Sequence, residues 1–578
     1  YVYTEMATIQ KKPSRGKEYW AIVESRRVNG KPRPIVLEHL GTAENLLKRL
    51  QEGVPKKVKS YSHGLVAYLL HVTESMGLVQ IINCHVPQKQ FRDGLTVGGS
   101  LILAALGRVC QPTSKRGWYE GWAKRTSLSY LLRLSLAKID SQHFWDQMHA
   151  LPSEAIPHIE EEIVDILYEQ GLLSVDTLLY DTTNFFTYIA STNTRCTLAE
   201  RGKNKQRRID LRQFGLLLLV SRDDHIPIYH SVYQGNLNDK TIFKEHFQRF
   251  AKRLKRFSGS LEDITVVLDQ GNNSKKILND VDQNIYFVGA LSPHQHKALI
   301  DRANLNLEEN TIGDRTVQCY QERTRVWGLD LTAVVYISEK LRDGQARGIE
   351  QKISKLFKKL DELRKTIKTP TKRGKKRTSD QLQKKVESWI ASDVPDNVIG
   401  WELTWLHDDA FELDFWVNGD QLDEIKEHNL GRRILITNRH HWSIEEVITA
   451  YWGQANIEYV FKNMKNPFHL AWRPQYHWTD HKIEVHGFIC LLAFFMVMFT
   501  FKQAKDRAGF SHSPHTLLEK LSEIRLATLI EAPKEKSKGR YKAVYQLEEM
   551  EPETQELAEA LGITQLPLRS QIPFSVYT

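Results

Sequence analysis

Three acidic residues that lie far apart in the sequence are the candidates for chemistry. Asp181 interrupts an apolar stretch, and Asp269 ends the run 264–268 directly before a Gln-Gly-Asn sequence. Such a position projects an acid from the carboxyl end of a central strand, where sites in α/β sheets commonly lie. Glu458 belongs to a stretch with helical spacing. Three carboxylates from two strands and one helix would form an all-oxygen cluster suited to Mg²⁺ or Mn²⁺, which implies phosphoryl chemistry.

The stretch around Glu458 has an unusual mixture of side chains. A single helix would place five of its residues on one face, because they are spaced three, four, three and four apart: Tyr451, Gln454, Glu458, Phe461 and Lys465. An acid, a base, an amide and two aromatic rings on one face fit neither an apolar core stripe nor an ordinary solvated surface. The alternative is that Glu458 is simply solvated, and only convergence with the two strand acids separates these interpretations.

Other acids are expected to have structural roles. Asp223 and Asp224 fall in a turn before Ile226, and Asp239 caps a helix that begins near residue 240. These residues do not displace the chosen three.

The three acidic blocks resemble the DDE transposases of bacterial insertion sequences, in the insertion-sequence-four type with a Tyr-Arg-Glu-Lys signature. That signature is Tyr, two residues, Arg, three residues, Glu, six residues and Lys. Tyr451, Glu458 and Lys465 match this spacing, and Gln454 stands where the family usually has Arg. The sequences DTTNFF from Asp181 and LDQGNNS around Asp269 resemble the family's first and second acidic blocks. The resemblance covers roughly residues 175–492.

This resemblance implies a function and its cofactor. Asp181, Asp269 and Glu458 would hold two Mg²⁺ or Mn²⁺ ions for cleavage and transfer of DNA strands at terminal inverted repeats, in cut-and-paste transposition. Tyr451, Gln454 and Lys465 would contact DNA. The partners would be double-stranded DNA of the transposon ends and the target, and the pairing of two ends makes a homodimer expected.

Alternatives to a transposase remain open. An RNase-H-like nuclease without strand transfer would use the same acids, and an inactive transposase-derived protein would bind DNA only. A serine or tyrosine recombinase would need a nucleophile within an arginine cluster, which the sequence does not contain.

Composition agrees with a large DNA-binding protein. The 578 residues exceed one core, 41% are hydrophobic, and the net charge is +10 with a pI of about 9.0. Five scattered cysteines without a paired CxxC motif point to a reducing cytosol, and the family resemblance implies a bacterial, nucleoid-associated location. The longest apolar run, from Gly487 to Phe501, is shorter than the roughly 20 residues of a membrane span, so no membrane partner is expected.

The predicted fold class is α/β, with a ribonuclease-H-like core that a large mixed β and helical insertion interrupts. The core should run strand, strand, strand, helix, strand, helix, strand, over 175–186, 214–221, 226–233, 240–256, 264–269, 273–282 and 285–291. The predicted divisions are an N-terminal β-hairpin domain (1–58), a helical DNA-binding domain (59–172), the first part of the core (173–295), the insertion (296–440), the second part of the core (441–505) and a C-terminal region (506–578).

The insertion follows from the spacing of the acids. Asp269 and Glu458 are 458 − 269 = 189 positions apart, whereas 269 − 181 = 88 separate the first two acids, and a structureless loop of the larger size is uncommon. Strands are expected over 316–320, 331–337, 401–405 and 411–417, with helices over 354–367 and 380–390. Trp327, Trp401 and Trp405 are expected in its core, although the resemblance implies that an insertion tryptophan can hold a flipped base.

Basic and aromatic residues outside the core are candidates for DNA contacts. Lys115, Arg116 and Trp118 lie in a segment that interleaves cations with aromatic rings, a composition that can neutralise phosphates and stack on bases. A helix pair with buried tryptophans is the equal alternative. Arg473, in a basic and aromatic turn after the Glu458 helix, completes the candidates.

Overall fold

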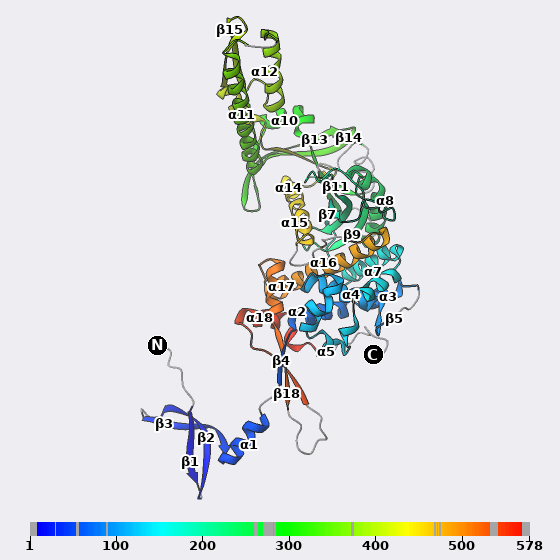
Figure 1. The fold of residues 1–578 in the computed structure, drawn as a ribbon, viewed down its shortest axis with the longest axis vertical. Helices are drawn as coiled ribbons and strands as arrows, with labels where there is room; N and C mark the ends of the chain where they lie inside the picture. Colours follow the sequence, from blue (N-terminus) through cyan, green and yellow to red (C-terminus); the bar gives the residue numbers. More distant parts are fainter. Residues whose placement is uncertain are drawn as a thin grey trace. The chain divides into compact units, whose positions relative to one another are not determined.

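The computed structural model describes residues 8–14, 16–28, 31–53, 57–87, 91–204, 206–258, 264–269, 275, 281, 285–371, 375–466, 470, 472, 476–531 and 542–568. The chain folds as two compact units. Unit 1 comprises Tyr1–Leu151, Phe468–Leu470 and Leu492–Thr578, and unit 2 comprises Pro152–Pro467 and Ala471–Leu491. Figure 1 shows the helices and strands coloured along the sequence. The expected mixed α/β class is confirmed.

Unit 2 is built on a nine-stranded sheet with the order β12-β13-β14-β17-β11-β10-β7-β8-β9. Its strands are β7 (Thr177–Thr187), β8 (Arg212–Ser221), β9 (Pro227–Gln234), β10 (Thr265–Leu268), β11 (Tyr286–Leu291), β12 (Glu308–Ile312), β13 (Arg315–Val326), β14 (Leu329–Ile337) and β17 (Arg432–Thr437). The five strands predicted for the core are β7, β8, β9, β10 and β11, and all five are confirmed. The predicted helix over 273–282 lies outside the described residues, apart from Lys275 and Val281.

The five core strands have a mixed arrangement. β7, β8 and β9 form antiparallel pairs, whereas β10 runs parallel to both β7 and β11. Numbered in chain order, these strands lie 3-2-1-4-5 across the sheet. The first and fourth strands, which carry the two predicted strand acids, are therefore neighbours.

One face of the sheet is covered by α8 (Asp239–Ser258). Tyr180 of β7 packs edge-on against Phe243 of this helix, with ring centroids 4.9 Å apart, and Tyr229 of β9 contacts Phe250. These rings are buried. Because strand side chains alternate between faces, the residues on either side of Tyr180 point away from α8.

The opposite face carries the C-terminal part of unit 2. Phe185 of β7 stacks on Trp472 at 4.8 Å, and an added Cβ at Gly487 would lie 2.9 Å from Trp472 and 3.3 Å from Val232 of β9. Gly487 belongs to α16 (Asp480–Ala508). The residues of this helix up to Leu491 fall in unit 2, and those from Leu492 fall in unit 1.

Helix α16 is longer than the apolar run indicated. It is the one single helix within the described residues that is long and apolar enough to cross a membrane, with 94% of its most apolar window buried in the protein, and a bent pair formed by α2 and α3 would be a second. Buried core helices of soluble proteins pass the same test. The expectation that this segment is too short for a span is therefore wrong on length.

The predicted insertion is only partly separate from the core. Its outer strands β12, β13, β14 and β17 continue the central sheet, since β17 pairs antiparallel with both β11 and β14. The chain segment that connects β14 to β17 forms a separate apolar core, in which Leu356, Leu360 and Val386 are fully buried. It is built by α11 (Glu339–Ile367), α12 (Ser379–Asp393), β15 (Ile399–His407), β16 (Ala410–Val417) and α13 (Gly419–His428), while α10 (Lys297–Leu305) precedes β12.

Trp405 corrects one prediction about the insertion. Its side chain is 62% exposed rather than buried, and its indole Nε1 donates to the carbonyl oxygen of Asp408, 3.1 Å away in the β15–β16 turn. Trp401 is half-buried against the insertion core, as expected. Trp405 shares a face of β15 with Trp401 and Leu403, which pack against the insertion core, but it lies farther along the strand, near the end of the hairpin.

Unit 1 combines small sheets with helices. The predicted hairpin is confirmed as β2 and β3, with a further strand β1 that was not predicted, while residues 29 and 30 between β2 and β3 lie outside the described residues. A second sheet has the order β19-β18-β4. The elements of this unit are β1 (Thr8–Ser14), β2 (Lys17–Val28), β3 (Lys31–Gly41), α1 (Ala43–Gly53), β4 (Lys57–Ser62), α2 (Gly64–Ser75), α3 (Leu78–Cys84), β5 (Phe91–Arg92), β6 (Leu95–Thr96), α4 (Val97–Cys110), α5 (Leu128–Leu132), α6 (Ser141–Ala150), α17 (Pro514–Glu523), β18 (Arg525–Glu531), β19 (Lys542–Leu547) and α18 (Pro552–Ala560).

A buried charge network holds α7 (Ile156–Glu169) and α8 to the β9 edge of the sheet. Glu160 of α7 binds His230 of β9, and its other carboxylate oxygen lies 3.5 Å from Nη1 of Arg253 in α8. All three side chains are buried. Removing the carboxylate would leave a buried guanidinium without this partner, and breaking such a pair costs about 3 to 5 kcal/mol.

We therefore predict that Glu160→Leu lowers the free energy of unfolding of unit 2 by about 3 kcal/mol. Urea titration of the full chain, followed by circular dichroism and tryptophan fluorescence, measures this change. Glu161→Leu is the matched control, because Glu161 pairs with the exposed Arg256 and such pairs contribute less than about 1 kcal/mol. Equal losses in the two variants would contradict a stabilising role for the buried network.

Candidate functional site

The two strand acids occupy neighbouring positions at the carboxyl end of a parallel strand pair. Leu268 of β10 pairs with Tyr180 of β7, so Asp269 and Asp181 are the next residues along the two chains. Parallel strands lie about 4.8 Å apart, and residues at matching positions point to the same face. Asp181 is partly buried and Asp269 is exposed. The structure thus brings together two of the three predicted acids.

Asp181 points toward the face opposite α8. Thr183 and Phe185 share its side of β7 by alternation, and Lys465 fixes this assignment. The Lys465 Nζ donates to Thr183 Oγ1 at 2.6 Å and lies 5.0 Å from the centre of the Phe185 ring. A cation therefore lies on the same face as Asp181, one side-chain repeat along the strand.

The predicted helix over Tyr451–Lys465 is two helices in the structure. α14 (Ile444–Trp452) begins with a capping box made by Ser443 and Glu446, and α15 (Gln454–Met464) follows the break at Gly453. Glycine lowers helix propensity, and an added Cβ at Gly453 would come within 3.0 Å of the Ala450 carbonyl oxygen and of Arg222 Cγ. The single-helix prediction is therefore wrong, and only the residues from Gln454 share one face of α15.

Helix α15 lies along β7 and is attached to that strand at both ends (Figure 1). At its start, Gln454 Nε2 donates to the carbonyl oxygen of Tyr180 at 3.2 Å, and just after its end Lys465 bonds to Thr183. Glu458 lies one helical turn after Gln454 on the same face and is exposed. The third acid is thus carried by a helix whose two contacts on β7 bracket Asp181.

The three acids do not form a ready-made metal cage. Within the described residues, which include all three, no group of three His, Cys, Asp or Glu side chains could hold one metal ion. Asp181 and Asp269 form the neighbouring pair. Mg²⁺ is commonly bound through one or two carboxylates plus water and substrate phosphate, so the strand pair has the donor chemistry for such an ion.

Tyr451 lies beside Asp269 at the end of α14. Burial raises the pKa of the Tyr451 phenol, and the charge of Asp269 raises it further. The phenol is therefore protonated at neutral pH and can donate a hydrogen bond. The Arg433 guanidinium, from β17, also contacts this phenol and acts in the opposite direction on its pKa.

The contacts that Gln454 and Arg433 make in the structure could not be predicted from the sequence. The Gln454 side chain is 8% exposed and is directed at the backbone of β7, so it supports the strand rather than facing DNA. The cation beside Tyr451 is Arg433, which pairs with Tyr336 across β14 and β17. No local sequence motif indicated a role for Arg433, because this residue comes close to Tyr451 only when the strands of the sheet have paired.

The candidates in unit 1 separate into core and surface residues. Trp118 is 3% exposed, packs edge-on against Trp122 and Phe144, and donates from Nε1 to the Leu103 carbonyl oxygen at 3.0 Å. The prediction that it contacts DNA is wrong, because its ring is enclosed by protein. Lys115 lies 4.8 Å over the Trp145 ring, and Arg116 is exposed. Arg473 lies outside the described residues.

Comparisons with known proteins add a family match at the N-terminus. Residues 7–61 match the model described as IS1634 family transposase, N-terminal domain. This match supports an insertion-sequence transposase. A comparison with curated proteins gives no match.

One solved structure is similar over most of the chain. It is described as a piggyBac transposase synaptic complex with hairpin DNA, with 9% sequence identity, 80% of this chain and 79% of that chain covered, and a TM-score of 0.37. A TM-score of this size does not establish a shared fold.

The burial of Trp118 leads to a stability prediction. Trp118→Ala should lower the free energy of unfolding of unit 1 by about 3 to 5 kcal/mol, because a large buried ring is lost and a cavity remains. Thermal and urea unfolding of the full chain provide the measurement. Arg116→Ala should change the stability by less than about 0.5 kcal/mol, and a comparably small effect of Trp118→Ala would contradict its place in the core.

Proposed function

We propose that this chain is a DNA transposase of an insertion sequence, with a ribonuclease-H-like core that cleaves transposon ends and transfers them to target DNA. The order 3-2-1-4-5 and the strand directions of β7, β8, β9, β10 and β11 support this assignment. The observation that carries the proposal is the parallel register of β7 and β10, which makes Asp181 and Asp269 neighbours.

The three acids are the proposed catalytic residues and metal ligands. Two Mg²⁺ or Mn²⁺ ions held by Asp181, Asp269 and Glu458 would supply the positive charge that in-line attack on a phosphodiester requires. Glu458 would join the strand pair when DNA is bound, because its helix is already attached to β7 on both sides of Asp181. Its exposure leaves the carboxylate accessible to substrate.

The other residues of the site would bind and orient DNA. Lys465, held by Thr183 on the Asp181 face, would hold a phosphate of the strand that is cut. Tyr451 would donate its phenolic proton to a second phosphate oxygen, with Arg433 beside it providing a positive charge. In this arrangement Gln454 positions α15. Arg433 would supply the positive charge that the signature arginine supplies in the family that this chain resembles.

The proposed partners follow from the reaction. Double-stranded DNA of the transposon ends and of the target would be the substrates, and the net charge of +10 favours such a polyanion. Two ends must be joined to one target, so we propose a homodimer in the DNA complex.

The decisive experiment uses labelled DNA carrying the element's own ends, with Mg²⁺, and measures cleavage and strand joining. Asp181→Asn, Asp269→Asn and Glu458→Gln should each lower both reactions at least about 100-fold, because each removes a charged ligand, while DNA binding remains. Asp223→Asn is the control, since this exposed acid of the β8–β9 turn pairs with Arg222 and should leave activity unchanged.

Other outcomes of this experiment would indicate a different function. Cleavage without joining would identify a nuclease, and binding without either reaction would identify an inactive descendant. Full activity in any one of the three acid variants would remove that residue from the site.

Lys465 and Lys462, near the end of α15, provide a second test, which concerns the proposed phosphate contact. Lys465→Ala should lower the cleavage rate about tenfold or more, because a charge-assisted phosphate contact on the Asp181 face is lost. Lys462→Ala should not, since Lys462 is exposed and it is Lys465 that is bonded to Thr183 of β7. Single-turnover cleavage at saturating DNA separates this effect from weaker binding, and equal rates in the two variants would contradict the role of Lys465.

A further inference from the structure

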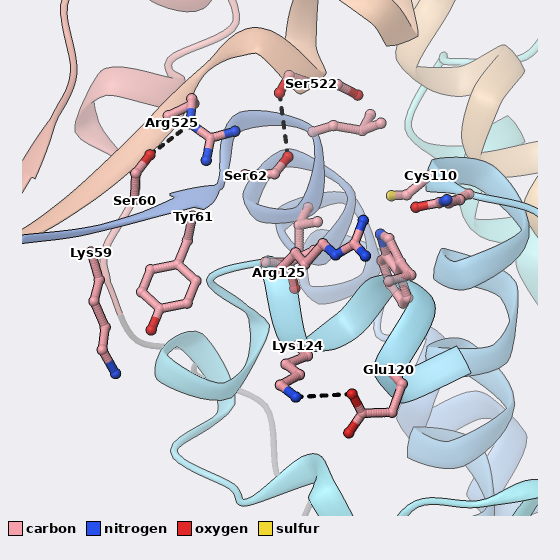
Figure 2. A pocket seen from close by; sticks show the side chains of 15 residues that line it. Lys59, Ser60, Tyr61, Ser62, Cys110, Glu120, Lys124, Arg125, Ser522 and Arg525 are labelled. Carbon is pink, nitrogen blue, oxygen red and sulfur yellow. Dashed lines mark hydrogen bonds and ion pairs between the residues drawn. The ribbon is translucent and has the colours of Figure 1, made fainter. Parts of the chain in front are cut away.

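Unit 1 contains a pocket that none of the proposed catalytic residues enters. It has a volume of about 740 Å³ and lies among β4, the turn at residues 120–126, α2, α17 and the start of β18. The residues that matter for its chemistry are Lys59, Ser60, Tyr61, Arg125, Thr126 and Arg525. Figure 2 shows the side chains that line it. Pockets of about 300 to 1,000 Å³ are typical of small-molecule sites.

The backbone places two arginines on opposite sides of β4. Ser62, the last residue of β4, pairs with Arg525 of β18 on one side and forms a parallel bridge to Thr126 on the other. The Ser127 amide also donates to the Ser62 carbonyl oxygen at 3.0 Å. Arg125 precedes Thr126 directly, so both guanidinium groups start from backbone that is bonded to the same residue.

The pocket carries an excess of positive charge. Lys124 is paired with Glu120 at 2.9 Å, which leaves Lys59, Arg125 and Arg525 as the remaining cations of the lining. Arg525 is held by Ser60, whose Oγ accepts from Nε at 2.6 Å, and its Nε lies 3.9 Å from Glu548. No hydrogen bond or ion pair joins Arg125 to another described residue.

Hydroxyl groups and an aromatic ring complete the lining. Tyr61 and Ser60 come from β4, and Tyr61 packs edge-on against Tyr130 with ring centroids 5.1 Å apart. In Figure 2 Arg525 lies on one side of β4, beside Ser60, and Arg125 lies on the other side of this strand. Guanidinium forks bind phosphate oxygens in pairs, and hydroxyls add further donors.

We propose that this pocket binds the phosphate of one nucleotide of the DNA held by unit 1. Arg125 and Arg525 clamp the phosphate from two sides, Lys59 adds charge, and Tyr61 lies beside the sugar or base. This inference rests on the proposed DNA-binding function and deepens it, because it places a DNA contact in unit 1 away from Lys115, Arg116 and Trp118.

Arg125→Ala tests the pocket with little risk to folding, since Arg125 is exposed. Fluorescence anisotropy of a labelled 20-base-pair duplex with the full chain, over a series of salt concentrations, gives affinity and salt dependence. We expect affinity to fall about tenfold and the slope of log affinity against log salt to decrease by about one, because one phosphate contact is lost. Arg125→Lys should keep the slope but not the full affinity, since it keeps the charge and loses the fork.

A control variant and two small phosphate ligands distinguish the ways in which this inference could be wrong. Lys138→Ala removes one exposed charge of the same unit and should change neither quantity. If the natural chain binds the duplex and Arg125→Ala binds equally well, the pocket inference is wrong and the DNA-binding function stands. If the natural chain binds no DNA but calorimetry detects dAMP or inorganic phosphate in an Arg125-dependent manner, the ligand is a free phosphate, and both the DNA assignment of the pocket and the proposed function are overturned.

Discussion

The parallel pairing of β7 with β10 is the constraint on which the candidate site depends. Hydrogen bonds between the strands fix Leu268 opposite Tyr180, and this register alone makes Asp181 and Asp269 neighbours across 88 positions of sequence. A slip of one residue would turn each side chain to the other face of the sheet. It would move Asp181 to the α8 side, where Tyr180 packs among Phe243 and Phe250. The buried aromatic rings under the sheet therefore help to hold the acids on the face opposite α8.

The same strand also positions the third acid. Gln454 and Lys465 contact β7 at Tyr180 and Thr183, so α15 takes its position from the strand that carries Asp181. The long segment between β11 and β17 does not disturb this arrangement, because Leu291 of β11 pairs with Ile434 of β17. The chain therefore leaves and re-enters the core on adjacent strands. An insertion anchored in this way can fold around its own apolar core without moving the acids.

Local sequence patterns predicted the helices and strands of this protein better than they predicted which strands pair with one another. The apolar runs before Asp181 and Asp269 were enough to predict β7 and β10, whereas the neighbourhood of these strands came from a family resemblance. The strands β12 to β14 were read as part of a separate insertion, because a strand's sequence does not state which strand it pairs with. Trp118 and Trp405 are misassigned for a related reason, because a tryptophan's burial depends on tertiary packing. Trp118 is enclosed by Phe144 and the Leu103 backbone, whereas the Trp405 ring is exposed at the end of its hairpin.

The electrostatics of the site follow from this geometry. Two carboxylates that start from neighbouring strands, about 5 Å apart in the backbone, repel each other when both are charged. The protein offsets part of this repulsion with Lys465 on the Asp181 face and Arg433 near Asp269 through Tyr451. A ligand of positive charge bound by both acids would relieve this repulsion.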